Sequence, residues 1–156
     1  MVKRNCITRF SYKIVNVILT QTDTTVGFLS QNKERLLEIK SRDTSKAFIK
    51  VYSNFLSFKK NKNRVPNSQK SKVRRSNKTT FIVKNMAFRV VNYQLNSSLL
   101  NKKWYYSTSA NETSKSFKRG FCEEKADIII EDKKLLHEGK SSILLKINSK
   151  KIRRLR

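Results

Sequence analysis

The chain has 156 residues, 37% of them hydrophobic, including nine Phe and five Tyr; this suffices for one domain with a buried core and argues against disorder throughout. Lysine and arginine number 36 against 11 acids, a formal charge of +25, which favours polyanionic partners such as nucleic acid, nucleotide phosphates or an anionic membrane. Two distant cysteines and one histidine argue against a metal site and against a Ser-His or Cys-His catalytic group.

The charge and the cysteines also indicate the setting of the protein. Residues 1–13 are basic and acid-free, and we interpret them as an N-terminal arm preceding a domain at residues 14–156. An organelle-targeting segment is the alternative interpretation. Two unpatterned cysteines fit a reducing cytoplasm, and no apolar run approaches the ~20 residues that span a bilayer.

Hydrophobic periodicity and turn residues predict an irregular succession of strands and helices. Strands are expected at 14–20, 47–52, 79–83, 86–91, 104–108, 127–130 and 142–147, and helices at 31–41 (capped by Ser30), 93–103 and 114–126. Residues 58–78 are expected to form a basic loop or a short exposed helix, and residues 150–156 a basic tail or edge strand. This order favours a single-domain α/β fold with a twisted mixed β-sheet flanked by helices, rather than a strict doubly wound sheet.

Three polar segments follow predicted strands or helices. The first is the turn from Thr22 to Gly27, where hydroxyl side chains can bond their own backbone and a ligand. The second is Lys40-Ser41-Arg42 at a predicted helix end, and the third is the loop from Ser107 to Asn111. Each has a plain structural alternative: an ordinary turn, a solvated helix end, and a loop that satisfies its own backbone.

The order and spacing of these segments resemble the threonylcarbamoyl-AMP synthases of the YrdC/YciO type. Members show a Pro-Thr-Asp-Thr-x-Tyr-Gly turn, a helix ending Ile-Lys-x-Arg-Pro with a Lys-Pro after it, a Val-Arg-Val strand, a Ser-Thr-Ser-Ala-Asn loop, and an Asp-hydrophobic strand before a Ser-Thr-Val strand. The matching residues here are Gln21-Thr-Asp-Thr-Thr-Val-Gly27, Ile39-Lys-Ser-Arg42, Lys46, Phe88-Arg-Val90, Ser107-Thr-Ser-Ala-Asn111, Ala126-Asp-Ile-Ile129 and Ser141-Ser-Ile143. The match spans about residues 14 to 155.

The resemblance implies a YrdC-like fold and a reaction that joins L-threonine, bicarbonate and ATP into threonylcarbamoyl-AMP, releasing pyrophosphate. Lys40 and Arg42 would neutralise the triphosphate. Ser109, Asn111, Ser141 and Ser142 would contact the nucleotide. Thr22, Thr24 and Arg89 would hold threonine, with a surface cation on an edge strand as the alternative for Arg89. Mg²⁺ would arrive on the ATP phosphates, with no resident metal site. A tRNA threonylcarbamoyl-transferase would be a partner.

The chain departs from the family pattern at several positions. Gln21 and Asp43 replace prolines, Val26 replaces the tyrosine, and Ser76–Thr80 replaces a Pro-Gly-Pro-Leu-Thr segment, while the middle of the chain is short. A second hypothesis is therefore a non-catalytic paralogue that binds double-stranded RNA or nucleotide through a basic concave face. A generic basic ribosome-associated protein is a third, which would not need the three polar segments.

Overall fold

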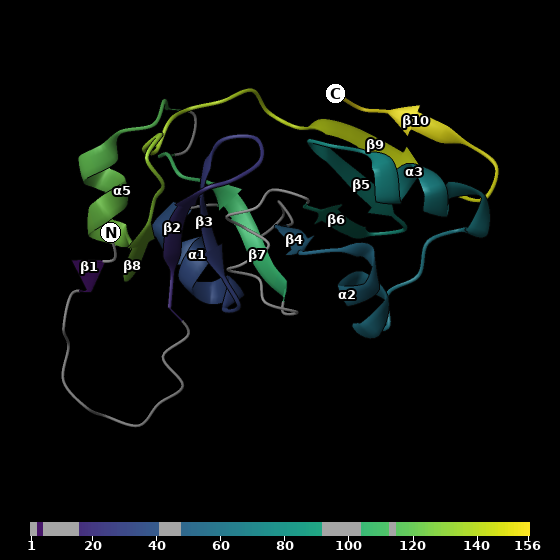
Figure 1. Ribbon diagram of the computed structural model, residues 1–156, viewed down its shortest axis with the longest axis horizontal. Helices are drawn as coiled ribbons and strands as arrows, with labels where there is room; N and C mark the ends of the chain where they lie inside the picture. The colour runs from purple at the N-terminus through teal and green to yellow at the C-terminus, as the bar shows by residue number, and fades with distance from the viewer. Residues whose placement is uncertain (1–2, 5–15, 41–47, 92–103, 113–114) are drawn as a thin grey trace.

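The computed structural model describes residues 3–4, 16–40, 48–91, 104–112 and 115–156, which form one mixed ten-stranded sheet (Figure 1). The strands are Lys3–Arg4 (β1), Ile18–Gln21 (β2), Val26–Ser30 (β3), Ile49–Tyr52 (β4), Thr79–Val83 (β5), Met86–Val90 (β6), Trp104–Ser109 (β7), Ile128–Ile130 (β8), Ile143–Ile147 (β9) and Ile152–Arg154 (β10). The helices are Lys33–Lys40 (α1), Phe55–Lys60 (α2), Lys70–Arg75 (α3) and Arg119–Lys125 (α5), with a 3₁₀ turn at Asn67–Gln69 (η1).

The sheet is mixed because parallel and antiparallel neighbours alternate irregularly along it. The strand order is β1-β8-β2-β3-β7-β4-β6-β5-β9-β10. Strands β2 and β8, β4 and β6, and β5 and β9 run parallel, while the other neighbours run antiparallel. This arrangement confirms the predicted twisted mixed sheet flanked by helices.

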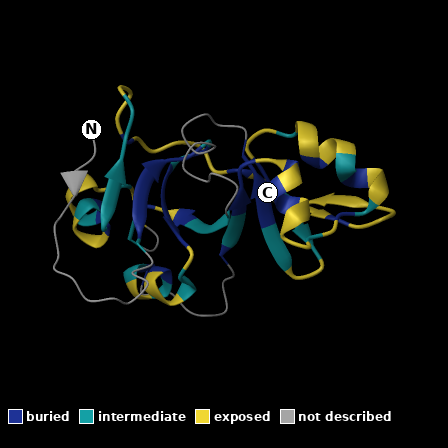
Figure 2. Ribbon diagram, turned by 60° about the horizontal axis from the view of Figure 1, so that its bottom comes forward, coloured by how far each residue is buried: buried dark blue, intermediate teal, exposed yellow. Residues whose placement is uncertain are grey.

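Two hydrophobic clusters lie between the sheet and its helices. The first joins α1 and α5 to β2 and β3 through Leu36, Cys122, Leu19 and Phe28 among others. The second joins α2 and α3 to β4, β5, β6 and β9, and Phe58 stacks on Phe88 with ring centroids 4.4 Å apart. Figure 2 shows the buried residues concentrated in the strands and the exposed residues on the outer sides of the helices.

The strand register gives the opposite face of the sheet a different character. Leu29 pairs with Ser107, which pairs with Ile49, and Val51 two residues later pairs with Arg89. Because side chains alternate between the two faces of a strand, these residues share the face away from Phe28 and Phe88. The candidate site therefore lies on the face opposite the described helices, where Ile18, Leu29, Val51 and Val91 form a third buried cluster.

Several predicted elements need correction. The segment after Thr25 is not a turn entering a helix, because Val26–Ser30 forms β3 and pairs with β2 as a hairpin. Ser30 does not cap the helix directly: Asn32 Oδ1 accepts bonds from the backbone N–H of Glu34 (2.9 Å) and Arg35 (3.2 Å), and Ser30 Oγ accepts that of Asn32.

Other elements are shorter or more ordered than predicted. Residues 58–78 contain the end of α2, η1 and α3 rather than one loop or helix, and the helix predicted at 114–126 is confined to Arg119–Lys125. The basic tail forms the edge strand β10. The helix predicted at 93–103 lies outside the described residues. The division at residue 13 stays a prediction, since 5–15 are also outside them. None of the helices described here has the length and apolarity needed to cross a membrane.

Candidate functional site

The turn of the β2–β3 hairpin is built by its own threonines. Thr22 Oγ1 accepts the backbone N–H groups of Thr24 (3.3 Å) and Thr25 (3.2 Å) and donates to Thr25 O at 2.6 Å. The Thr22 and Thr24 hydroxyls lie 3.3 Å apart. The turn is thus held by side-chain bonds to its own backbone, as its hydroxyl-rich sequence predicted.

Gly27 is required next to this turn by a close approach of two backbones. A Cβ at this position would lie 2.9 Å from Thr108 O and 3.0 Å from Thr22 Cγ2. Glycine at position 27 therefore lets β3 pack against β7 just after the turn.

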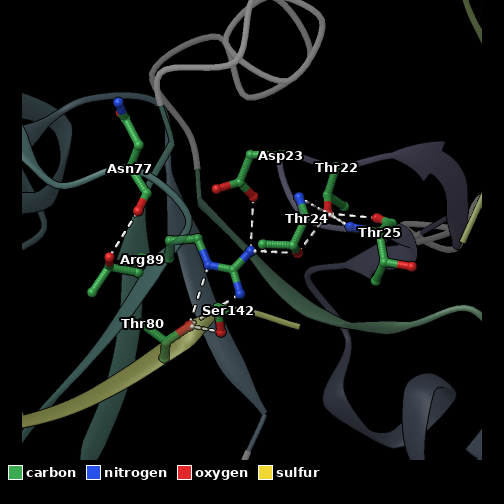
Figure 3. A network of polar contacts seen from close by, with 9 residues as sticks. Thr22, Asp23, Thr24, Thr25, Asn77, Thr80, Arg89 and Ser142 are labelled. Atoms are coloured by element: carbon green, nitrogen blue, oxygen red, sulfur yellow. Dashed lines mark hydrogen bonds and ion pairs between the residues drawn. The ribbon is translucent and has the colours of Figure 1, made fainter. Parts of the chain in front are cut away.

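Arg89 lies at the centre of a buried polar network that joins the hairpin turn to β5 and β9 (Figure 3). One terminal nitrogen donates to Asp23 Oδ1 at 2.7 Å and to Thr24 Oγ1 at 3.0 Å. Nε and the other terminal nitrogen donate to Thr80 Oγ1 at 3.2 and 3.0 Å. Thr80 Oγ1 lies 2.9 Å from Ser142 Oγ.

The burial of Arg89 decides between its two interpretations. Only 6% of the residue is exposed, and β6 lies inside the sheet between β4 and β5. The alternative of a surface cation on an edge strand is therefore wrong. A buried guanidinium needs a compensating charge, which Asp23 supplies.

Lys40, at the end of α1, holds the Ser107–Asn111 loop. Its Nζ donates to Ser109 O at 3.0 Å, to Asn111 Oδ1 at 2.7 Å and to Asn111 O. Ser109 Oγ donates to the same Asn111 Oδ1 at 2.7 Å, and Asn111 Nδ2 donates to Lys115 O. With only 5% of Lys40 exposed, the alternative of a solvated helix end is wrong for this residue.

Cys122 of α5 also contacts the Ser107–Asn111 segment. Its buried thiol donates to Ala110 O at 3.2 Å. Burial raises the pKa of the Cys122 thiol, so the group stays a protonated donor at neutral pH. The loop is thereby fixed by Lys40 on one side and by a thiol on the other.

A cavity of about 230 Å³ lies between the hairpin turn, the end of β7 and the start of β9. Its lining consists of Thr22, Thr24, Thr25, Gly27, Ile49, Arg89, Ser107, Thr108, Ser109, Ser141, Ser142 and Arg156. The lining combines hydroxyl groups with two guanidinium groups and contains no aspartate or glutamate side chain, so it suits an anionic, hydrogen-bonding ligand.

The structure brings most of the predicted site residues together. Thr22, Thr24 and Arg89, predicted for threonine, share the cavity with Ser109, Ser141 and Ser142, predicted for nucleotide. Lys40 and Asn111 do not line it but hold Ser109 through the loop. Arg42 and Lys46 lie outside the described residues. The roles of all these residues stay predictions.

Arg156 is a cavity residue that the sequence did not indicate. Its Nε donates to Ser142 O at 3.3 Å, and its backbone O accepts the N–H of Leu144 at 3.1 Å. The sequence shows only a basic tail here, and the pairing of β10 with β9 turns that tail back toward the cavity. Ile49 was also missed, because nothing but strand register places it there, whereas Ser107 and Thr108 belong to a polar segment that the sequence singled out.

Comparison with known proteins supports the fold. Neither a family model nor a curated protein sequence matches the chain. Among solved structures, Pyrococcus abyssi (P. abyssi) Sua5 complexed with L-threonine superposes with a TM-score of 0.72 at 15% identity, over 90% of this chain and 50% of that one. E. coli YciO gives 0.60 at 16%, over 91% and 82%. The chain has the Sua5/YciO-type fold.

A third structure carries the same fold within a much larger protein. Full-length HypF in its phosphate- and nucleotide-bound form superposes with a TM-score of 0.69 at 13% identity, over 90% of this chain and 22% of that one. The present chain spans about half the length of the Sua5 chain that it matches. The Sua5/YciO-type fold is thus the part these proteins share.

Proposed function

We propose that this chain is a threonylcarbamoyl-AMP synthase-like protein, which forms threonylcarbamoyl-AMP from L-threonine, bicarbonate and ATP for the modification of tRNA. The observation that carries the proposal is the single cavity where Arg89, Thr24 and Ser142 meet the end of β7. The fold adds support, because the Sua5 structure is a complex with L-threonine and the HypF structure is bound to nucleotide.

The proposed reaction proceeds in two steps. The threonine amine combines with bicarbonate to give a carbamate, and water is released. A carbamate oxygen then attacks the α-phosphorus of ATP, the bond from that phosphorus to the bridging oxygen of the β-phosphate breaks, and pyrophosphate leaves. Both reacting partners are anions, so the protein must supply positive charge and hydrogen-bond donors around them.

Arg89 is proposed to bind the threonine carboxylate while Asp23 holds it in place. Its bonds to Asp23, Thr24 and Thr80 occupy four of the five guanidinium N–H groups. The fifth is available to a ligand, together with the hydroxyl group of Thr24, while the Thr22 hydroxyl holds the turn that carries Thr24. The ligand would thus accept a hydrogen bond from the remaining N–H group of Arg89, whose direction the other four bonds already fix.

The nucleotide is proposed to bind at the other end of the cavity, against Ser109, Ser141 and Arg156. Lys40 would act by positioning Ser109 and Asn111, and Arg42 would contact the phosphates. Mg²⁺ would be held by the triphosphate and water, since the cavity lining has hydroxyl and guanidinium side chains but no aspartate or glutamate. The product would pass to a tRNA threonylcarbamoyl-transferase in the cytoplasm.

The test is pyrophosphate release from ATP by the purified chain, with threonylcarbamoyl-AMP identified by mass. Release should require both threonine and bicarbonate. Arg156→Gln should lower kcat/KM for ATP by about tenfold to a hundredfold, the range expected for one charge-assisted contact to phosphate. Arg154→Gln, two residues away on β10 and outside the cavity lining, is the matched control and should change it less than twofold. Absence of release that depends on both substrates would overturn the synthase proposal.

A second candidate is a non-catalytic protein that binds nucleotide or double-stranded RNA. It is favoured by the polar bonds that Lys40 and Arg89 already make within the chain. If no product forms, calorimetric titration with ATP shows whether the cavity binds nucleotide without catalysis. In that case Arg156→Gln should weaken ATP binding and Arg154→Gln should not.

A further inference from the structure

A smaller cavity, of about 180 Å³, adjoins the first one at the tip of the β2–β3 hairpin. Thr25, Ser109 and Ser141 line both cavities, so the two are neighbours. One wall of the smaller cavity comes from Glu138 and Gly139, in the segment between β8 and β9 that crosses the hairpin tip (Figure 1). We call this smaller cavity the side cavity.

The side cavity differs in chemistry from the first cavity. The lining of the first cavity has two guanidinium groups and no aspartate or glutamate side chain. The side cavity has three apolar lining residues, Val26, Ala110 and Phe117, and one carboxylate, that of Glu138. A phosphate chain is therefore attracted to the first cavity, whereas an uncharged group with a flat apolar face and a hydrogen-bond donor suits the side cavity.

Phe117 presents an aromatic ring to the side cavity. The residue is partly buried and packs against the hydrophobic cluster that contains Val26 and Ala110. A residue that served only the core would be covered by it, but Phe117 also lines a cavity that is open enough to leave Glu138 and Ser141 exposed. A ring anchored on one side and accessible on the other is suited to stacking on a nucleotide base.

Glu138 lies beside this ring with an oxygen to spare. Its Oε2 accepts the backbone N–H of Phe117 at 3.4 Å, which is longer than the usual limit of about 3.2 Å for such a bond. In a chain of formal charge +25, its carboxylate forms no ion pair with any cation that the structure describes. Support of the Phe117 backbone uses one carboxylate oxygen at most, so the other can accept a bond from a ligand.

We propose that Phe117 and Glu138 select the base of the bound nucleotide. The Phe117 ring stacks on the base, and the Glu138 carboxylate accepts a hydrogen bond from an exocyclic amino group. The base is adenine, a choice that rests on the proposed function, in which ATP is the substrate. The phosphates then lie toward Arg156 in the first cavity, which keeps their negative charge away from Glu138.

The test of Glu138 is calorimetric titration of the full chain with ATP and with purine riboside triphosphate, which lacks the amino group of adenine. The unmodified chain should bind ATP about tenfold more tightly, the effect expected for one hydrogen bond to a charged group. In Glu138→Ala the two affinities should differ less than twofold, because the acceptor of the amino group is gone.

The matched control for this variant is Glu124→Ala. Glu124 is also exposed, forms no ion pair with the described residues and lines neither cavity. Its removal changes the net charge equally and should leave the tenfold preference for ATP intact. An equal preference in Glu138→Ala and in the unmodified chain would overturn the role of Glu138, and tighter binding of GTP than of ATP would overturn the choice of adenine.

The test of Phe117 compares two phenylalanines of the same cluster. Phe117→Leu should weaken ATP binding about tenfold, the effect of losing one stacked base, and should leave the affinity for inorganic triphosphate unchanged. Phe121 also packs against the cluster but does not line the side cavity, so Phe121→Leu should weaken ATP binding less than twofold. Equal losses in the two variants would overturn the stacking. Should Phe117→Leu fail to fold, the exposed Glu138 still provides the test.

These measurements also separate base selection from the proposed reaction, because they record binding alone. Threonine-dependent pyrophosphate release by a chain whose preference for ATP survives in Glu138→Ala would leave the synthase proposal standing and overturn the base selection. The expected loss of preference in a chain without release would support the base selection and overturn the synthase proposal. A chain that binds no ATP would overturn the base selection directly.

Discussion

Asp23 and Arg89 form an ion pair that connects the β2–β3 hairpin to β6. Their nitrogen–oxygen distance is 2.7 Å, and their side chains are 12% and 7% exposed. Removing one partner of a buried pair leaves an uncompensated charge and commonly costs about 3–5 kcal/mol. This pair therefore contributes to the shape of the cavity as well as to its charge.

The first stability prediction concerns this ion pair. Asp23→Asn and Arg89→Gln should each lower the free energy of unfolding by about 2–4 kcal/mol, and the double variant should lose at least 1 kcal/mol less than the sum, because the remaining charge is then absent. Urea denaturation of the four proteins measures this coupling.

An exposed ion pair provides the control. Arg35 lies 3.5 Å from Glu38 and 3.6 Å from Asp127 with nearly half of its side chain exposed, so Arg35→Gln should change stability by about 0.5 kcal/mol or less. Additive effects of Asp23→Asn and Arg89→Gln would contradict the coupling.

At the scale of single residues, the sequence predicted which side chains gather but not how they are bonded. The order of the three polar segments correctly predicted that Lys40, Ser109 and Asn111 lie together. It could not predict the pairing of Arg89 with Asp23, since the two positions are 66 residues apart and meet only through strand order. The burial of Arg89 has the same origin, because nothing in the sequence places β6 inside the sheet.

At the scale of elements, the segment between β8 and β9 crosses the tip of the β2–β3 hairpin. Its backbone bonds there include Val26 N–H to His137 O (3.2 Å) and Gly139 N–H to Thr25 Oγ1 (3.1 Å). A Cβ added to Gly139 would lie 2.0 Å from Thr24 O, whereas one added to Gly120 would meet nothing within 4 Å. The crossing segment is therefore held against the turn by a glycine that cannot be enlarged.

The second prediction compares these two glycines. Gly139→Ala should destabilise the protein by about 1–3 kcal/mol, because the backbone of the crossing segment must move away from Thr24. Gly120→Ala, in the exposed first turn of α5, should stabilise it by up to about 1 kcal/mol through a better helix propensity. Thermal unfolding of both variants gives the comparison, and a neutral Gly139→Ala would show that the segment yields without cost.

The elements that the sequence missed share a physical cause. Strand β3 has no polar alternation, because all five of its residues are buried, and its glycine indicated a turn. Asn54 caps helix α2, because its Oδ1 accepts the N–H of Ser57 at 2.7 Å. The six residues of α2 are too few for a helical period to be visible. Both elements are specified by packing against distant strands rather than by local pattern.

At the scale of the whole molecule, the separation of charge opposes compact folding. Residues 48–91 and 139–156 contain 19 lysines and arginines and no aspartate or glutamate, and these cations repel one another. Net charge of one sign destabilises a compact state through this repulsion. Salt weakens it, because the screening length falls from about 10 Å at 0.1 M to about 3 Å at 1 M ionic strength.

The last prediction follows from that repulsion. Raising NaCl from 0.1 to 1 M at pH 7 should stabilise the chain by about 1–2 kcal/mol, which for a domain of this length corresponds to a rise of roughly 2–8 °C in Tm. Lys146→Gln/Lys151→Gln/Arg153→Gln removes the like-charged pair across β9 and β10, so its Tm should already be higher at 0.1 M and should rise less with salt. Lys118→Gln/Lys125→Gln/Lys133→Gln lies among acids and should keep the full salt response. Scanning calorimetry of the three proteins tests this. A Tm that is flat or falls with salt in the unmodified chain would show that repulsion among these cations does not limit the stability of the fold.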